Sequence, residues 1–270
     1  MTQESPQRPL NVSRAVRQKL ESLKGAGISH VPKAKARTAR AAAASVSPPR
    51  AVTAAKPVPA MTMAALPVVR AAQVAPVMAD ESREAALAAV ARRVAACTRC
   101  ADLAASRTQT VFGTGNPHSN LVFLGEAPGA DEDREGKPFV GRCGQLLTDI
   151  ITKGMQLRRE DVYIMNILRC RPPNNRPPLP VEAASCREYL DAQLAIVRPK
   201  FICCLGATAA QNLLQVDTAI GHLRGRMIDF QGMRVLCTYH PAYLLRTPSA
   251  KRIVWDDIQI LMAEMGLKSG

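Results

Sequence analysis

Short runs of apolar residues recur along the C-terminal two thirds of the chain and predict buried strands. The four runs lie at 121–125, 161–166, 200–205 and 234–238. Amphipathic segments flank them and predict helices at 82–96, 143–153, 181–197, 207–215 and 249–265. Alternation of strands and helices through short connections is typical of a parallel sheet covered by helices. We therefore expect an α/β fold, a three-layer α/β/α sandwich whose central, mostly parallel sheet has about four strands.

The first 80 residues differ in composition from the rest and predict a disordered, basic, Ala/Pro-rich extension. They hold 12 Lys or Arg and 3 Asp or Glu, which gives a net charge of +9, and no aromatic residue. Such a segment cannot bury enough apolar surface to fold. The folded domain is expected to span 81–270. The acid-poor tail would also fit a mitochondrial transit peptide. Residues 18–23 loosely resemble peptides that dock on replication sliding clamps, but they lack the usual terminal aromatic, and a short solvated helix is the simpler interpretation.

The net charge of the whole chain is +14, which indicates a polyanionic partner, most simply nucleic acid. The N-terminus does not have the pattern of a secretory signal, and no apolar run reaches 18 residues, so no membrane span is expected. We expect a monomeric, cytoplasmic protein associated with the nucleoid. Eight cysteines in such a chain indicate metal ligands or buried thiols rather than disulfides.

The first predicted strand runs into a loop that carries acids and an aromatic ring. The sequence reads GEAPG from Gly125 and GKPFVG over 136–141. Ligands bind at the carboxyl ends of parallel strands, and glycines there allow a close backbone approach. Glu126, Glu132 and Phe139 are therefore candidates for a binding or catalytic site. The alternative is an ordinary turn whose acids cap the next helix.

Two further predicted strands end in polar groups. Asn166 presents acceptor and donor atoms in one plane, which complements the edge of a nucleic acid base, although it could equally form a turn. His240 begins the segment HPAYLLR and could stabilise negative charge on a leaving group, or it could only hydrogen-bond locally. In the same segment Leu244, Leu245 and Arg246 could contact DNA, with a leucine wedged into the base stack; the leucines could instead be core residues.

Four cysteines form a candidate metal site. Cys97 and Cys100 make a C-x-x-C motif, while Cys170 and Cys186 flank the proline-rich loop RPPNNRPP. Four thiolates could hold zinc or an iron–sulfur cluster. The second pair is 16 residues apart, which favours the larger cluster. The remaining cysteines are Cys203, Cys204 and Cys237, expected to pack as small hydrophobic residues, and Cys143, which receives no role.

Over residues 82–265 the chain resembles the type 4 uracil-DNA glycosylases, the iron–sulfur branch of that superfamily. The resemblance is carried by an ordered set of motifs: C-x-x-C, GEAPG, GKPFVG, the Asn-ended strand, CRPPNNRPP, the fourth cysteine and HPAYLLR. The resemblance implies a base excision repair enzyme that flips uracil out of single- or double-stranded DNA. It hydrolyses the N-glycosidic bond and leaves an abasic site and free uracil. It also implies a structural 4Fe–4S cluster on Cys97, Cys100, Cys170 and Cys186.

The resemblance further implies a role for each motif residue. Around the base it places the GEAPG backbone at Gly125, Phe139 stacking on uracil, Asn166 reading its edge and Asn175 near the substrate. In catalysis it implies Glu126 positioning water, Glu132 as a second acid and His240 on uracil O2. The competing interpretations are a non-catalytic iron–sulfur or zinc DNA-binding protein and a redox protein that uses the cluster for electron transfer.

Overall fold

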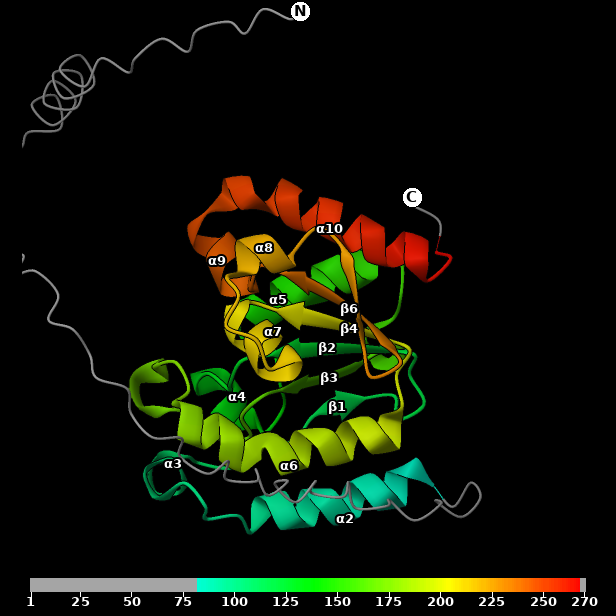
Figure 1. The fold of residues 1–270 in the computed structure, drawn as a ribbon. Helices are drawn as coiled ribbons and strands as arrows, with labels where there is room; N and C mark the ends of the chain where they lie inside the picture. The colour runs from blue at the N-terminus through cyan, green and yellow to red at the C-terminus, as the bar shows by residue number, and fades with distance from the viewer. Residues whose placement is uncertain (1–81, 268–270) are drawn as a thin grey trace, which may run out of the picture. The chain divides into compact units, whose positions relative to one another are not determined.

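A mixed sheet of six strands forms the centre of the computed structural model, which describes residues 82–267 (Figure 1). The strands are β1 (Thr114–Gly115), β2 (Leu121–Gly125), β3 (Tyr163–Asn166), β4 (Phe201–Leu205), β5 (Met227–Phe230) and β6 (Met233–Thr238). Their order is β1-β3-β2-β4-β6-β5. The four inner strands are parallel, and β1 and β5 pair antiparallel at the two edges. The α/β sandwich prediction is confirmed, but the expected number of about four strands omitted both edge strands.

Helices cover both faces of this sheet (Figure 1). One layer contains α6, with α2 packed on its outer side, together with α7; the other contains α5 and α10. The longer helices are α2 (Arg83–Ala95), α5 (Arg142–Asp149), α6 (Pro180–Val197), α7 (Ala207–Leu214) and α10 (Lys251–Glu264). The short ones are α3 (Ala101–Ser106), α4 (Ala130–Glu135), α8 (Ile220–Leu223) and α9 (Pro241–Arg246). A π-helical turn (Ile150–Gly154) extends α5, and 3₁₀ turns lie at Arg159–Asp161, Pro173–Asn175 and Pro248–Ala250.

Burial on both faces explains why the inner strands read as continuous apolar runs. In β2, Val122 and Leu124 point into the layer that contains α6 and α7. Leu121 and Phe123 point into the layer of α5 and α10. The cysteines predicted to pack as small hydrophobic residues are confirmed as core residues, because Cys203, Cys204 and Cys237 are fully buried.

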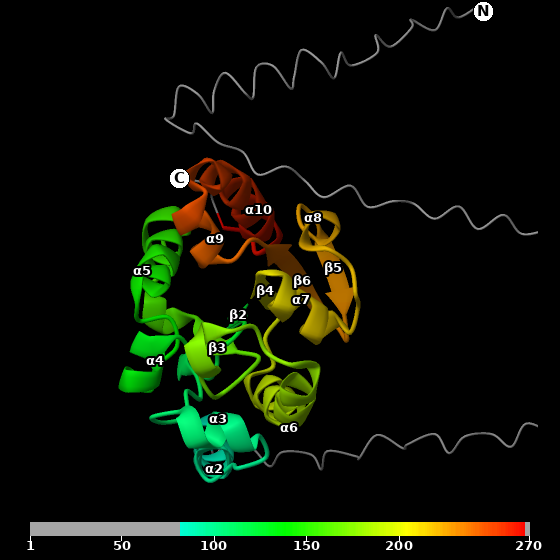
Figure 2. The same ribbon diagram turned by 90° about the vertical axis from the view of Figure 1, so that its left-hand side faces the viewer.

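The register of the parallel strands places their carboxyl ends at one edge of the sheet. Gly125 at the end of β2 pairs with Asn166 at the end of β3, and Leu205 of β4 pairs with Thr238 of β6. Figure 2 views the sheet toward this edge, where α4, α5 and α9 are arranged around the strand ends. The loops after β2, β3 and β6 are therefore neighbours in space although they are far apart in the sequence.

No helix within residues 82–267 combines the length and the apolar character needed to cross a membrane. The predictions of a disordered basic extension over 1–80, of a transit peptide and of a clamp-binding segment at 18–23 concern residues outside the described part of the chain.

Candidate active site

A pocket opens at the carboxyl edge of the sheet. Its volume is about 550 Å³, within the range of small-ligand sites. It is lined by the loops after β2, β3 and β6 and by residues of the short helices α4 and α9 and of the first turn of α5. The residues of its wall that the sequence singled out are Glu126, Glu132, Phe139, Asn166, Asn175, His240 and Arg246. Side chains from three strand ends and the proline-rich loop therefore share one cavity.

Phe139 lies in this pocket in a rare backbone conformation. Its φ is +55°, a region that bulky residues seldom adopt. A Cβ on Gly125 would lie 2.5 Å from Phe139 Cζ and 2.4 Å from Asn166 Oδ1. A Cβ on Gly144 would lie 1.8 Å from the carbonyl oxygen of Phe139. Gly125 thus leaves the space that the aromatic ring and the carboxamide need, and Gly144 leaves the space that the backbone of Phe139 needs.

Asn166 carries a buried polar atom without a partner. The residue is 2% exposed, and its Oδ1 accepts no hydrogen bond from any described residue. An unsatisfied buried acceptor costs roughly 1–3 kcal/mol and calls for an explanation. Because Asn166 lines the pocket, a ligand that presents an N–H group to Oδ1 would satisfy it. The site is therefore prepared to receive a hydrogen-bond donor.

His240 is held as a neutral imidazole with a defined proton position. Burial, and to a lesser extent the nearby cation of Arg246, lowers the pKa of His240 from the ordinary value near 6.5 to about 4. Its Nδ1 accepts a hydrogen bond from the backbone N–H of Ala242 at 3.1 Å, which caps α9. Since Nδ1 is an acceptor, the single proton of the neutral ring is on Nε2. The centroids of the His240 and Phe139 rings are 5.8 Å apart. The Nε2–H group of His240 therefore offers a hydrogen-bond donor close to the Phe139 ring.

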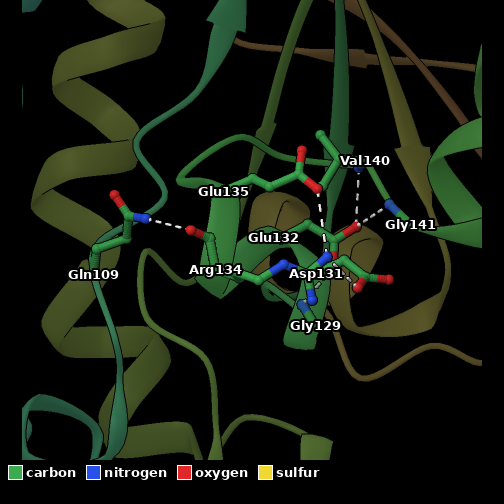
Figure 3. A network of polar contacts seen from close by, with 8 residues as sticks. All are labelled: Gln109, Gly129, Asp131, Glu132, Arg134, Glu135, Val140 and Gly141. Atoms are coloured by element: carbon green, nitrogen blue, oxygen red, sulfur yellow. Dashed lines mark hydrogen bonds and ion pairs between the residues drawn. The ribbon is translucent and has the colours of Figure 1, made fainter.

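The two acids of the loop, Glu126 and Glu132, differ in their contacts, and Figure 3 shows those of Glu132. The carboxylate of Glu132 accepts hydrogen bonds from the backbone N–H groups of Gly129, Val140 and Gly141 at 3.0, 3.0 and 3.1 Å. These bonds connect the start of α4 to the loop that carries Phe139. The carboxylate of Glu126 forms no hydrogen bond with another residue of 82–267 and faces the pocket. Glu126 is thus available for chemistry, whereas the contacts of Glu132 are those of a positioning residue.

The residues predicted to contact DNA or to lie near the substrate differ in their exposure at the rim of the pocket. Asn175 and Arg246 line it, and Arg171 Nε donates to Asn175 Oδ1 at 2.8 Å. Leu245 is 37% exposed and can meet a ligand outside the pocket, but Leu244 is only 2% exposed and packs in the core. The prediction that Leu244 contacts DNA is therefore wrong in this structure, because the short helix α9 turns its side chain inward.

The four candidate metal ligands gather at one end of α6. Cys100, Cys170 and Cys186 belong to the same apolar cluster. Burial raises the pKa of these three thiols, and the nearby Cys97 raises each of them further by like-charge repulsion. Arg107 Nη1 donates to Cys170 Sγ at 2.9 Å. All four are free thiols, and we call them the four-thiol group. Across residues 82–267, no set of three or more His, Cys, Asp or Glu side chains is placed to hold a metal ion; the iron–sulfur cluster stays a prediction.

Sequence reasoning missed several residues of the pocket wall. Cys143 received no role, yet it lines the pocket at the first turn of α5, where burial raises the pKa of its thiol. Arg176 also lines the pocket and forms an ion pair with the nearly buried Glu182 at 2.5 Å, which anchors the proline-rich loop to α6. The signal for Cys143 was its place two residues after the GKPFVG motif; the ion pair of Arg176 follows no local pattern.

Comparison with known proteins gives consistent matches. The model of the uracil DNA glycosylase superfamily matches residues 112–259. A type-4 uracil-DNA glycosylase of Thermotoga maritima is 46% identical over 182 residues, which cover 66% of this chain and 94% of that protein. A type-4 uracil-DNA glycosylase of Archaeoglobus fulgidus is 44% identical over 178 residues, 63% of this chain and 88% of that protein.

More distant proteins also match. A type-5 uracil-DNA glycosylase of Pyrobaculum aerophilum is 29% identical over 146 residues, which cover 48% of this chain and 64% of that protein. The crystal structure of wild-type Pedobacter heparinus SMUG2 has a TM-score of 0.38 and 15% identity, and the match covers 55% of this chain and 76% of that chain.

Proposed function

This chain belongs to the uracil DNA glycosylase superfamily, and on that premise we propose that it is a type-4 enzyme that flips uracil out of DNA and hydrolyses its N-glycosidic bond. The products are an abasic site and free uracil. The observation that carries the proposal is the unpartnered Oδ1 of Asn166, in one pocket with the ring of Phe139 and the neutral His240.

Recognition of uracil follows from the atoms around Asn166. Uracil presents an N–H at position 3 beside a carbonyl at position 4, so Oδ1 would accept from N3–H and the amide N–H would donate to O4. Cytosine presents the opposite pattern at both atoms and would leave buried groups unpaired, which rejects an analogue strongly. Phe139 would stack on the face of the ring. Base choice then depends mainly on this one carboxamide.

Access to the pocket requires a base outside the helical stack. Extrusion of a nucleotide costs a few kcal/mol and is least costly for a poorly paired base. Uracil opposite guanine, the product of cytosine deamination, would therefore enter more readily than uracil opposite adenine. Leu245 and Arg246 lie at the rim, where they would contact the strand and its phosphates.

Bond cleavage would use one donor and one carboxylate. The C1′–N1 bond breaks toward an oxocarbenium-like sugar and a uracil anion, as in other glycosyl hydrolyses. His240 Nε2–H would donate to uracil O2, where the negative charge develops. Glu126 would offset the positive charge of the sugar and orient the attacking water. The oxygen of this water bonds to C1′, and the proton it releases balances the charge of the uracil anion, which leaves as neutral uracil. Glu132 would act indirectly, through the loop of Phe139 to which it is hydrogen-bonded.

We also propose a 4Fe–4S cluster on the four-thiol group. The support is chemical: four free thiols from three separate segments lie close enough to influence one another, and Arg107 contributes a positive charge to Cys170. Thiolates are the usual ligands of such clusters. A bound cluster would supply metal–thiolate bonds to three segments: the one that follows α2, the one that follows β3, and α6. These bonds would join the segments near the loop that carries Asn175.

The proposed function is tested by excision from a labelled single-stranded oligonucleotide that holds one uracil, followed by alkali to break abasic sites. Cleavage only at uracil supports the glycosylase. Protein with its full content of iron and sulfide that binds DNA but never cleaves would favour the alternative, a non-catalytic DNA-binding protein. An oligonucleotide with thymine or cytosine at the same position is the matched control.

A further inference from the structure

Arg159 contacts the loop of Phe139 from outside the pocket. It lies in the 3₁₀ turn directly before β3. Its Nη2 donates to the carbonyl oxygens of Pro138 and Phe139 at 3.0 and 2.9 Å, and its Nη1 donates to Thr148 Oγ1 at 2.8 Å. All of its side-chain hydrogen bonds in the described part of the chain thus go to neutral oxygen atoms.

This placement has an energetic cost that its contacts must offset. Arg159 is half-buried, and the partial removal of its guanidinium from water lowers its pKa. A charged donor makes stronger hydrogen bonds than a neutral one, and the planar fork of arginine can serve several acceptors at once. Thr148 extends this hydrogen-bond network to Gly144, because its Oγ1 donates to the carbonyl oxygen of Gly144 at 2.9 Å. The cation therefore links the carbonyl side of the Phe139 loop to α5.

The amide side of the same loop is held by an anion. Glu132 accepts from the N–H groups of Val140 and Gly141 (Figure 3). Phe139 lies between the two groups with its φ at +55°. A strained backbone persists only where its surroundings determine it fully. Opposite charges on the two sides of residues 138–141 provide such surroundings.

We infer that Arg159 is a positioning residue of the enzyme: it fixes the backbone of Phe139 so that the ring is ready to stack on the base. Arg159 is not part of the pocket wall as the structure describes it and lies behind the loop, so it acts through Phe139 and not on the substrate. The inference rests on the proposed function, because it uses the stacking role of Phe139.

The test replaces the cation by an unbranched apolar side chain, Arg159→Met. We expect kcat/KM for uracil excision to fall at least about tenfold. Arg159→Lys keeps the charge but not the fork and should recover part of the loss. The matched control is Arg158→Met, because Arg158 is the exposed neighbour and pairs only with Glu160 and Asp161 in the described residues. Arg158→Met is expected to retain wild-type kinetics.

A double-mutant cycle separates positioning from general destabilisation. If Arg159 acts through the ring, Arg159→Met should change kcat/KM less than about twofold in a Phe139→Ala background. Equal losses in the two backgrounds would overturn the inference, since the effect would then not depend on Phe139.

Hydrogen–deuterium exchange of the peptide that contains residues 138–141 gives a readout independent of activity. We expect its amides to exchange at least about tenfold faster in Arg159→Met than in wild type or Arg158→Met. Unchanged exchange would overturn the inference. If wild-type protein releases no uracil, the proposed function fails by itself, and the exchange experiment still decides whether Arg159 holds the loop.

Discussion

The ring of Phe139 occupies the space that a side chain on Gly125 would require, since a Cβ there would lie 2.5 Å from its Cζ. The same Cβ would lie 2.4 Å from Asn166 Oδ1. The positions of the Phe139 ring and of the Asn166 carboxamide, which we propose to stack on the base and to read its edge, therefore depend on the absence of a side chain at the end of β2. This dependence gives the most direct test of the pocket.

Gly125→Ala should displace both groups. Overpacking at such a site costs about 1–3 kcal/mol, and we expect kcat/KM to fall at least about tenfold. The measurement is steady-state uracil release, with thermal unfolding alongside. Gly221→Ala is the matched control, because a Cβ at Gly221 meets nothing within 4 Å. A Gly125→Ala enzyme with wild-type kinetics would show that the pocket relaxes without consequence.

Asn166→Leu keeps the size of the side chain and removes its polar atoms. We expect kcat/KM to fall about 100-fold or more, because uracil N3–H and O4 would be left unpaired. The free energy of unfolding should not decrease, since the change also removes a buried acceptor without a partner. Denaturant unfolding and uracil release measured on the same preparation separate the two effects. A parallel loss of stability and activity would argue against a recognition role.

The low pKa of His240 predicts an unusual dependence of activity on pH. With a pKa of about 4, the imidazole stays neutral through the range where an ordinary histidine gains its proton. We expect kcat/KM to show no loss near pH 6.5 and an acidic limb near pH 4. A limb near pH 6.5 that disappears in His240→Gln would contradict the neutral donor.

The same group should make stability depend on pH. Between about pH 6.5 and 4 the unfolded chain binds a proton at His240 that the folded protein does not, so stability falls as pH falls through this window. The loss is at most about 3 kcal/mol. Denaturant unfolding of wild type and His240→Gln at several pH values measures it: the difference between the two should change only within the window.

Glu132→Ala removes the acceptor of three backbone N–H groups. These bonds are partly buried. Because a fully buried donor without a partner costs about 1–3 kcal/mol, we expect a decrease in the free energy of unfolding toward the lower end of that range for each bond, and a loss of activity. Glu135→Ala is the control, because its carboxylate is about half exposed and contacts only Arg134, at 3.5 Å, in the described residues. Equal stability of the two variants would mean that water replaces the lost carboxylate.

Loss of one ligand should empty the proposed iron–sulfur site. We expect wild-type protein purified without air to contain about four iron atoms and four sulfides, and Cys170→Ala to contain far less. Cys143→Ala should keep the full content, because Cys143 lies on the pocket wall apart from the four-thiol group. Elemental analysis with the visible absorption spectrum measures this. Iron content that is equal in wild type and Cys170→Ala would remove Cys170 from the ligand set.

The inner strands were predictable because burial on both faces produces uninterrupted apolar runs. The edge strands were not: β1 has only two residues, and β5 is partly exposed and pairs only with β6. Short edge strands take their structure from a neighbour rather than from a pattern of their own.

The candidate site was predictable at the level of residue type but not of contact. Strand ends and motifs indicated Glu126, Phe139, Asn166 and His240, and the shared edge of the parallel strands brings them into one pocket. The hydrogen bonds of Glu132 to the loop eight and nine residues later leave no mark in the sequence. A helix of six residues is also too short for its sequence to show which side faces the core. The sequence therefore did not indicate that Leu244 is buried and Leu245 exposed.

The segment from Arg159 to Asn166 acts as a spacer of fixed length. Arg159 is hydrogen-bonded to the loop of Phe139 at one end, and Asn166, the proposed reader of the base, lies at the other. Between them β3 is paired on both sides, with β1 and β2. One residue added to or deleted from this stretch would shift the register of β3 and turn every side chain beyond the change to the opposite face of the sheet. Insertions and deletions between Arg159 and Asn166 should therefore abolish activity, whereas substitutions that preserve the length should change it only in degree.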